Sequence, residues 1–194
     1  MTRIIAGFAG SLTIEVPGVG TRPTSDRVRE AIFSALNSRD VLEGARVLDL
    51  YAGSGALGLE AASRGAATVT LVESDARAAA TCRKNTALVL RNAGVASGLT
   101  IDIVAVSVQS FLGRTTARAV TIAFLDPPYD LPEAELTRDL ALLTATLAPD
   151  AVVVIERSSR SPEPIWPPGL ALDKLKKYSD TAVWIARAEP TQQS

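Results

Sequence analysis

The sequence predicts an α/β fold: one doubly wound, mostly parallel sheet of seven strands that ends in an antiparallel hairpin, with a short N-terminal β-hairpin arm. Apolar strand-like runs alternate with helix-like segments through the middle of the chain, which indicates a parallel sheet with helices on both faces. Two strand-like segments near the C-terminus flank a short polar turn, and two shorter ones near the N-terminus flank glycines. The length of 194 residues indicates a single domain.

The chain is expected to begin with an arm at residues 1–20, which extends the main domain at 21–189 and leaves a flexible tail at 190–194. Within the arm, residues 3–6 and 12–16 read as two short strands, because apolar residues recur there between glycines. The two strands are expected to pair as a hairpin around Gly7 and Gly10, and a turn is expected after them at residues 17–20.

The first helix is expected to begin at the polar run Thr24-Ser25-Asp26 and to continue to Leu36. Side chains of these three types accept hydrogen bonds from the free N–H groups of a helix N-terminus. Beyond Leu36 strands and helices alternate. The expected strands cover residues 46–51, 68–73, 100–106, 120–125, 151–156, 170–177 and 182–188, and the expected helices cover 55–64, 75–90 and 132–146.

Composition restricts the chemistry that this chain can perform. Hydrophobic residues make up 47% of the chain and charged residues 21%, which predicts a folded domain with a sizeable core. Histidine is absent, so the commonest general base and metal ligand are both missing. The single cysteine, Cys82, can form no intrachain disulfide, and no metal site is expected. No apolar run approaches the roughly 18 residues of a membrane span and no signal peptide is evident, so a cytoplasmic location without membrane contact is expected.

The segment 124–129, Phe-Leu-Asp-Pro-Pro-Tyr, is the most informative in the chain. An apolar strand ends at Asp126, and two prolines then prevent both a strand and a helix from continuing. The turn therefore offers the Asp126 carboxylate, the Pro127 carbonyl and the ring of Tyr129 close together. This set suits a planar group that carries an NH2: two acceptors for its hydrogens and a ring to stack on. The alternative is a rigid turn in which Tyr129 is a core aromatic.

A second motif lies upstream, where the strand 46–51 leads into Gly53-Ser54-Gly55-Ala56-Leu57-Gly58, a G-x-G-x-x-G pattern. Glu73 ends the next strand twenty residues after Gly53, where a carboxylate can bind ribose hydroxyls. The pattern fits a nicotinamide dinucleotide or S-adenosylmethionine. Asp49 favours the second, because an anion at the strand end would repel a pyrophosphate but suits the ammonium of a methionine moiety. A glycine turn that binds nothing is the remaining alternative.

Three carboxylates, Asp49, Glu73 and Asp126, follow or end predicted strands at their carboxyl ends. Ligands of such sheets bind at that edge. We therefore expect these side chains to meet in one site.

The chain resembles bacterial methyltransferases that modify guanine N2 in small-subunit ribosomal RNA, the RsmD family. Arg22-Pro23-Thr24 and the helix after it discriminate best, because generic amino-methyltransferases share the glycine loop and Asp-Pro-Pro-Tyr but not this segment. The resemblance implies a Rossmann-like S-adenosylmethionine-dependent methyltransferase fold. It also implies a cytoplasmic monomer that acts on 16S rRNA within the small subunit or an assembly intermediate. The likeness covers nearly the whole chain and rests on residues 3–7, 21–33, 48–58, 72–73, 125–129 and 178–181.

The resemblance also implies roles for individual residues. Catalysis is expected from Asp126, Pro127 and Tyr129. RNA contacts are expected from Arg22, Pro23, Thr24, Arg27, Arg29, Pro128 and Tyr129, and cofactor contacts from Asp49, Tyr51, Gly53, Ser54, Gly55, Glu73, Ser74, Ser107, Val108 and Asp126.

Three positions depart from the family pattern. Ser11 stands in the arm where a basic residue is usual, and Ser179 replaces a glycine in the last turn. Ser107 stands where an Asp or Asn usually reaches the adenine; its hydroxyl or the amide of Val108 could take that contact.

The net charge of −1 is low for a nucleic-acid-binding protein. Two groups of basic residues are candidates for RNA contact, although each could equally be a solvated face. A substrate already folded on a ribosomal particle would lessen the need for a basic protein. The first group is Arg22, Arg27 and Arg29, and the second is Arg157, Arg160, Lys174, Lys176 and Lys177.

Other functions remain open at this point. One is methylation of a different amine, such as adenine N6 in DNA or a glutamine side chain. DNA enzymes usually need an added recognition domain, and glutamine enzymes typically carry Asn in place of Asp126. A nicotinamide-dependent oxidoreductase and a non-catalytic RNA-binding module are the two further alternatives.

Overall fold

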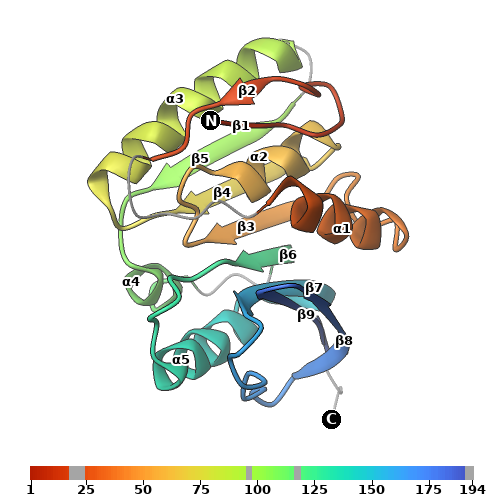
Figure 1. The fold of residues 1–194 in the computed structure, drawn as a ribbon, viewed down its shortest axis with the longest axis vertical. Helices are drawn as coiled ribbons and strands as arrows, with labels where there is room; N and C mark the ends of the chain where they lie inside the picture. Colours follow the sequence, from red (N-terminus) through yellow and green to blue (C-terminus); the bar gives the residue numbers. More distant parts are fainter. Residues whose placement is uncertain (18–24, 95–97, 116–118, 191–194) are drawn as a thin grey trace.

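The computed structural model describes residues 1–17, 25–94, 98–115 and 119–190. Its main sheet has seven strands in the order β5-β4-β3-β6-β7-β9-β8 (Figure 1). The pairs from β5 through β7 are parallel, whereas β7–β9 and β8–β9 are antiparallel, so the predicted fold is confirmed. The strands are β3 (Arg46–Leu50), β4 (Thr68–Val72), β5 (Thr100–Val104), β6 (Val120–Leu125), β7 (Leu147–Ser158), β8 (Leu170–Tyr178) and β9 (Thr181–Ala188).

Helices cover both faces of this sheet, because alternate residues of a strand point to opposite sides. In β6, Ile122 and Phe124 join the apolar cluster under the first three helices. Ala123 and Leu125 join the cluster under the last two. The helices are α1 (Asp26–Asn37), α2 (Ala56–Ser63) and α3 (Ala76–Ala93) on the first face, and α4 (Val108–Leu112) and α5 (Glu133–Thr144) on the second.

The N-terminal arm pairs over fewer residues than expected. Its antiparallel strands are β1 (Thr2–Arg3) and β2 (Thr13–Ile14), instead of 3–6 and 12–16. Ile4, directly after β1, still donates to the carbonyl of Leu12 (2.9 Å) and accepts from the N–H of Ser11 (2.8 Å), but the N–H groups of Ile5 and Ala6 bond to the side chain of Glu60 in α2 instead of to a strand.

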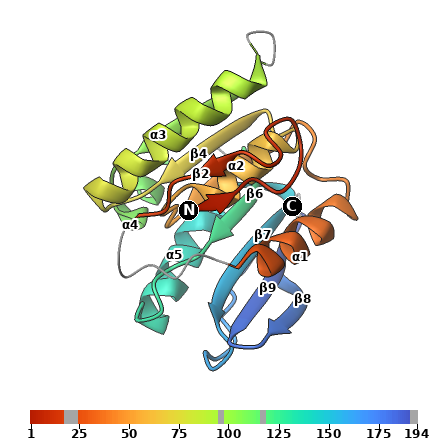
Figure 2. The same cartoon turned by 45° about the horizontal axis from the view of Figure 1, so that its top comes forward.

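The arm is tied to α2 by two polar side chains. Glu60, which is fully buried, accepts hydrogen bonds from the N–H groups of Ile5 (2.6 Å) and Ala6 (3.1 Å). Ser63 Oγ accepts from the N–H of Ala9 (2.9 Å). Figure 2 shows the arm lying across α2, between α1 and α3. The arm is therefore fixed to the helix that follows the glycine-rich loop.

Two elements differ from the expected ones. The sequence pattern missed α4, a helix of one to two turns whose N-cap, Ser107, accepts a hydrogen bond from the N–H of Ser110 (3.2 Å). β7 begins at Leu147 instead of residue 151, because an irregularity between Val120 and Ile122 lets Leu147 as well as residues 152–155 pair with β6. No helix in the described ranges is both long and apolar enough to cross a membrane.

Candidate active site

The glycine-rich loop joins β3 to α2 with a tight turn. Tyr51, Gly53 and Gly55 have φ of 63°, 56° and 78°, in the left-handed region that favours glycine. One turn into α2, a Cβ added at Gly58 would lie only 2.5 Å from the side chain of Leu71 in β4. The missing side chain at Gly58 thus allows α2 to approach the sheet closely, the part that the third glycine plays in such loops.

Asp49 lies in β3 beneath this loop and is 1% exposed. Its Oδ2 accepts a hydrogen bond from the N–H of Gly58 (2.8 Å). Burial nevertheless raises the pKa of Asp49 to about 7, and the negative charges of Asp126 and Glu73 add to this rise. β3 pairs with β4 and β6, and Leu50 lies opposite both Val72 and Leu125, so Asp49, Glu73 and Asp126 stand at neighbouring strand ends on the carboxyl edge of the sheet, as the strand pattern predicts.

Glu73, at the end of β4, is oriented by two backbone amides. Its Oε2 accepts from the N–H of Gly53 (2.8 Å) and its Oε1 from the N–H of Asp75 (2.7 Å). The carboxylate is only partly buried, and the neighbouring Ser74 is exposed. Each Glu73 oxygen keeps a second lone pair. The expected contacts of Glu73 and Ser74 with a ribose stay predictions that this geometry allows.

Two side chains of α3 support the glycine-rich loop from the protein interior. Cys82 Sγ donates to the carbonyl of Gly53 (3.2 Å), and Asn85 Nδ2 donates to the carbonyl of Ser54 (2.8 Å). Asn85 also exchanges two hydrogen bonds of 2.9 Å with the backbone of Glu15, so it joins the arm to the loop. Burial raises the pKa of Cys82 to about 12, which makes it an unreactive core thiol.

Tyr51 turns its hydroxyl away from the loop, toward α5. The hydroxyl donates to the carboxylate of Asp139, which is fully buried. Burial and this hydrogen bond raise the pKa of Tyr51. A cofactor contact from Tyr51, as the sequence predicts, would therefore have to come from its ring or its backbone.

The Asp-Pro-Pro-Tyr segment forms the loop after β6, called here the 126–132 loop. Asp126 is partly buried and Pro127 is buried, whereas Pro128 is exposed. Tyr129 is 55% exposed. The alternative in which Tyr129 is a core aromatic is therefore wrong, and its ring is available for stacking.

Arg157, at the end of β7, holds the 126–132 loop in place. Its guanidinium donates to the carbonyls of Pro128 (3.3 Å) and Leu131 (3.0 Å) and pairs with the carboxylate of Glu133 (2.6 Å). Arg157 is 4% exposed. This arginine is therefore no part of a solvated basic face, which corrects one of the candidate RNA contacts.

The predicted RNA contact at Arg29 is also wrong. Arg29 is fully buried in α1, where its Nη2 donates to Thr2 Oγ1 (2.7 Å), to the carbonyl of Arg3 (2.9 Å) and to Asp26 Oδ1 (2.6 Å). It anchors the arm instead of facing solvent. Arg27, two residues earlier, is exposed. The remaining expected contacts of this group, Arg22, Pro23 and Thr24, lie outside the described residues.

Ser107 and Val108 occupy the turn after β5. The hydroxyl of Ser107 caps α4, so one of its lone pairs is in use. The N–H of Val108 lies in the first turn of α4, where backbone N–H groups lack partners within the helix. Of the two expected adenine contacts, the amide of Val108 is the better placed by local structure.

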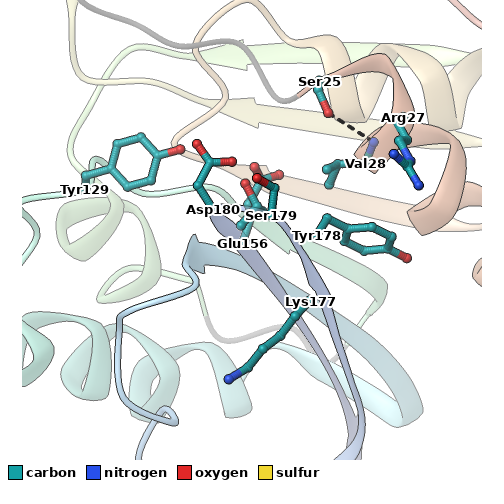
Figure 3. Close-up of a pocket in the computed structure, with 10 residues that line it drawn as sticks. Ser25, Arg27, Val28, Tyr129, Glu156, Lys177, Tyr178, Ser179 and Asp180 are labelled. Atoms are coloured by element: carbon teal, nitrogen blue, oxygen red, sulfur yellow. Dashed lines mark hydrogen bonds between the residues drawn. The ribbon is translucent and has the colours of Figure 1, made fainter.

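A cavity of about 350 Å³ opens beside the 126–132 loop. Figure 3 shows that its walls come from the start of α1, the loop itself, the end of β7 and the β8–β9 turn. The sequence pattern missed Glu156 and Asp180 as site residues, although both stand near strand ends. The lining residues are Ser25, Arg27, Val28, Tyr129, Glu156, Lys177, Tyr178, Ser179, Asp180 and Thr181.

The sequence profile of a family described as "Conserved hypothetical protein 95" matches residues 2–187. The chain belongs to this family. Ribosomal RNA small subunit methyltransferase D of Escherichia coli (strain K12) is 35% identical over 99% of this chain and 92% of its own length. The Haemophilus influenzae protein of the same name is 33% identical over 82% of this chain and 80% of its own length. The resemblance to the RsmD family is thus confirmed.

Solved structures of relatives have the same fold. The Escherichia coli protein yhhF has a TM-score of 0.81 at 34% identity, and the match covers 98% of this chain and 99% of that one. The rRNA methyltransferase aviRa of Streptomyces viridochromogenes has a TM-score of 0.67 at 16% identity, over 88% of this chain and 87% of that one, and shows the fold alone. The chain is a methyltransferase of the RsmD family, and the predicted cofactor, S-adenosylmethionine, agrees with this membership.

Proposed function

We propose that this protein transfers a methyl group from S-adenosylmethionine to the exocyclic N2 amine of a guanine in 16S ribosomal RNA. One observation carries the proposal: the 126–132 loop connects the carboxylates at the edge of the sheet with the cavity. Asp126 at its start lies close enough to Asp49 to raise the pKa of that carboxyl, and Tyr129 lines the cavity. A base held in the cavity can therefore present an amine at the cofactor site. The RsmD relatives named above support ribosomal RNA as the substrate.

The carboxylate cluster fits a cationic cofactor. Asp49, Glu73 and Asp126 raise the local negative potential, which disfavours a pyrophosphate and favours a ligand with an ammonium and a sulfonium. This argues against the nicotinamide-dependent alternative. Asp49 and Glu73 would hold the cofactor, together with the backbone of the glycine-rich loop. When bound, S-adenosylmethionine supplies a methyl group that is electrophilic because it sits on a positively charged sulfur.

The residues of the 126–132 loop supply what the reaction needs from the protein. The Asp126 carboxylate and the Pro127 carbonyl each accept one N–H of the amine, which pulls the nitrogen toward pyramidal geometry and takes its lone pair out of conjugation with the ring. Such positioning can contribute about 7–11 kcal/mol. The ring of Tyr129 stacks on the base, a contact worth about 1–3 kcal/mol. The methylated nitrogen loses its proton to Asp126 or to solvent, so no histidine is required.

The substrate is a base that has left its helix or is already unpaired, because the N2 amine cannot reach the loop from within a duplex. A protein with a net charge of −1 gains little from phosphate contacts alone. We therefore infer that this protein acts, as a cytoplasmic monomer, on 16S rRNA already folded in the small subunit or an assembly intermediate. If purified enzyme methylated naked 16S rRNA much faster than small subunits, this part of the proposal would be wrong.

Mass-spectrometric mapping of 16S rRNA tests the proposed reaction. Cells that lack the gene should lose one N2-methylguanosine, and wild-type protein should restore it. Asp126→Ala protein should not restore it, yet should bind S-adenosylmethionine in calorimetry with near-normal affinity. Loss of an N6-methyladenosine instead would show that the substrate assignment is wrong, and an unchanged map would show that the protein has another substrate.

A further inference from the structure

We propose that the cavity beside the 126–132 loop reads the target base through an acidic wall formed by Glu156 and Asp180. This inference rests on the proposed function, because it assigns the means by which the same site selects guanine. The two carboxylates accept N–H groups from the donor edge of the base, while Tyr129 stacks on its face.

The placement of the carboxylates supports this inference. Glu156 is 5% exposed and reaches the cavity from β7, where its backbone pairs with Val183 of β9. Asp180 reaches it from the β8–β9 turn. Figure 3 shows both gathered with Ser179 at the centre, with Tyr129 on one side and the side chain of Lys177 directed away from them. The cavity lining also includes Arg27 and Lys177, but the charged side chains gathered at its centre are the two carboxylates.

An acidic cavity is unexpected in a protein that binds RNA, because carboxylates repel phosphates. It therefore serves some other part of the substrate. A metal ion is a poor candidate, since no group of three or more Asp, Glu, His or Cys among the described residues is placed to hold one. In an RNA substrate, the group that suits two carboxylates is a neutral one with several N–H donors. Glu156 and Asp180 already make other contacts in the protein, but a carboxylate offers about four acceptor positions.

Among the four bases, guanine matches this wall best. Its Watson–Crick edge presents the N1–H and the N2 amine side by side, so three hydrogens lie in a row. Adenine and cytosine each place a bare ring nitrogen beside their amine, and uracil flanks its single N–H with two carbonyls. A carboxylate opposite any of these acceptors is repelled. The N1–H is therefore the hydrogen that the acidic wall reads, next to the amine held by Asp126 and Pro127.

The base analogue 2-aminopurine tests this contact, because it keeps the reacting amine but has a bare nitrogen in place of N1–H and no oxygen on the neighbouring carbon. The response to the carboxylate variants separates a preference that comes from N1–H from one that comes from this oxygen. The mapping experiment above gives the target position. A synthetic segment carrying guanosine or 2-aminopurine there can be ligated into 16S rRNA and assembled into small subunits. Wild-type enzyme should methylate the 2-aminopurine particle about tenfold more slowly or worse in single-turnover assays.

Asp180→Asn and Glu156→Gln should then reduce the preference for guanosine over 2-aminopurine. Each amide can turn its NH2 toward the bare nitrogen, so the guanosine rate should fall about tenfold while the 2-aminopurine rate holds or rises. Asp150→Asn is the matched control: the same chemical change at the opposite end of β7, at a side chain that is 61% exposed. It should leave both rates unchanged.

Two results would overturn the inference. Wild-type enzyme could methylate both particles equally, which would show that N1–H is not read. The two variants could instead slow both substrates by the same factor, which is what a purely structural role predicts. Asp180 lies in an exposed turn, so its variant keeps the test available even if Glu156→Gln does not fold. A failure of the proposed function is distinguishable, because the mapping experiment would then give no guanine to replace.

Discussion

The N-terminal arm and the 126–132 loop are both irregular segments, and each is fixed by a buried arginine. Arg29 donates to two oxygens of the arm, and Arg157 donates to two carbonyls of the loop. The exposed fractions of the two residues are 0% and 4%. The sequence predicted both to be exposed cations, yet each is buried and holds a neighbouring segment in place through hydrogen bonds.

The two segments differ in what they carry. The arm is also hydrogen-bonded to Glu60, Ser63 and Asn85, so these contacts remain when Arg29 is replaced. The 126–132 loop carries the groups that we propose to bind the base, and Arg157 donates to the carbonyls of Pro128 and Leu131, on either side of the exposed Tyr129. We therefore expect equal burial to have unequal consequences: Arg29 should contribute mainly to stability, and Arg157 to the geometry of the reaction.

Replacing Arg157 should give the largest effect. In Arg157→Met the loop carbonyls lose their donor, and a displacement of about 1 Å at the amine site can lower the rate about 100-fold. Arg157→Lys keeps the charge beside Glu133 but cannot bond both carbonyls. Its methylation rate should therefore lie between those of Arg157→Met and wild type. Single-turnover methylation of small subunits measures the rate, and calorimetry should show near-normal affinity for S-adenosylmethionine.

A matched control separates this role from a general loss of stability. Arg39 is a partly buried arginine that, like Arg157, pairs with a carboxylate, that of Asp173, but it lies just beyond the C-terminal end of α1. Arg39→Met should lower the melting temperature without changing the rate. If Arg157→Met lost stability but kept its rate at a temperature where it stays folded, Arg157 would have no positioning role.

Arg29→Met should lower stability instead of activity. The cost should be about 1–3 kcal/mol, because the oxygens of Thr2 and Arg3 lose a charged donor, whereas the side chain of Asp26 is 47% exposed and can be solvated by water. Chemical denaturation measures this loss. Below the melting temperature, the remaining bonds from α2 and α3 should keep the arm in place, so the methylation rate should stay within about threefold. A rate as low as that of Arg157→Met would remove the distinction between the two segments.

Asp49→Asn should move stability and activity in opposite directions. The pKa of Asp49 is about 7 in the folded protein, against about 3.9 for an unfolded chain. Folding therefore favours the protonated form, and this contribution is lost as pH rises from about 4 through 7. The variant should be more stable than wild type at pH 8, and the difference should vanish toward pH 4. Thermal melts across this range give the comparison.

The same variant should bind S-adenosylmethionine at least about tenfold more weakly at pH 8, because it lacks the charge that faces the cationic cofactor. In wild type, cofactor binding lowers the pKa of Asp49, so calorimetry near pH 7 should detect proton release, and affinity should fall as pH drops below 7. Asp49→Asn should show neither effect. A wild-type affinity that is constant between pH 6 and 8 would contradict this role for Asp49.

The sheet could be predicted from sequence because each of its strands carries its own signal. Alternating apolar residues marked the strands, and Asp49 and Asp126 could be placed at one edge because parallel strands end together. Helix α4 was missed because its five residues are too few to show a helical period of apolar residues. Arg29 and Arg157 were misassigned for a different reason: their acceptors lie on other segments, and charge alone predicts exposure. The cavity residues Glu156 and Asp180 become neighbours only through the β7–β9 pairing.

The smallest expected effects concern two serines with backbones in the left-handed region. One lies in the N-terminal arm and the other in the β8–β9 turn. Ser11 in the arm has φ of 71°, and Ser179 in the turn that lines the cavity has φ of 52°. Glycine relieves a strain of about 1–2 kcal/mol there, partly offset by the greater entropy of the unfolded chain. Ser11→Gly and Ser179→Gly should each raise stability by about 0.5–1 kcal/mol in denaturant titrations.

Their effects on activity should nevertheless differ. Ser179 precedes Asp180, so a more flexible turn should loosen the acidic wall and lower the guanosine rate a few-fold, whereas Ser11→Gly should leave the rate as it is. Strain at Ser179 would then be a cost that keeps a base-reading carboxylate in place. If both variants gained stability with no change in rate, the strained turn would be as dispensable for catalysis as the arm, and the 126–132 loop alone would set the geometry of the reaction.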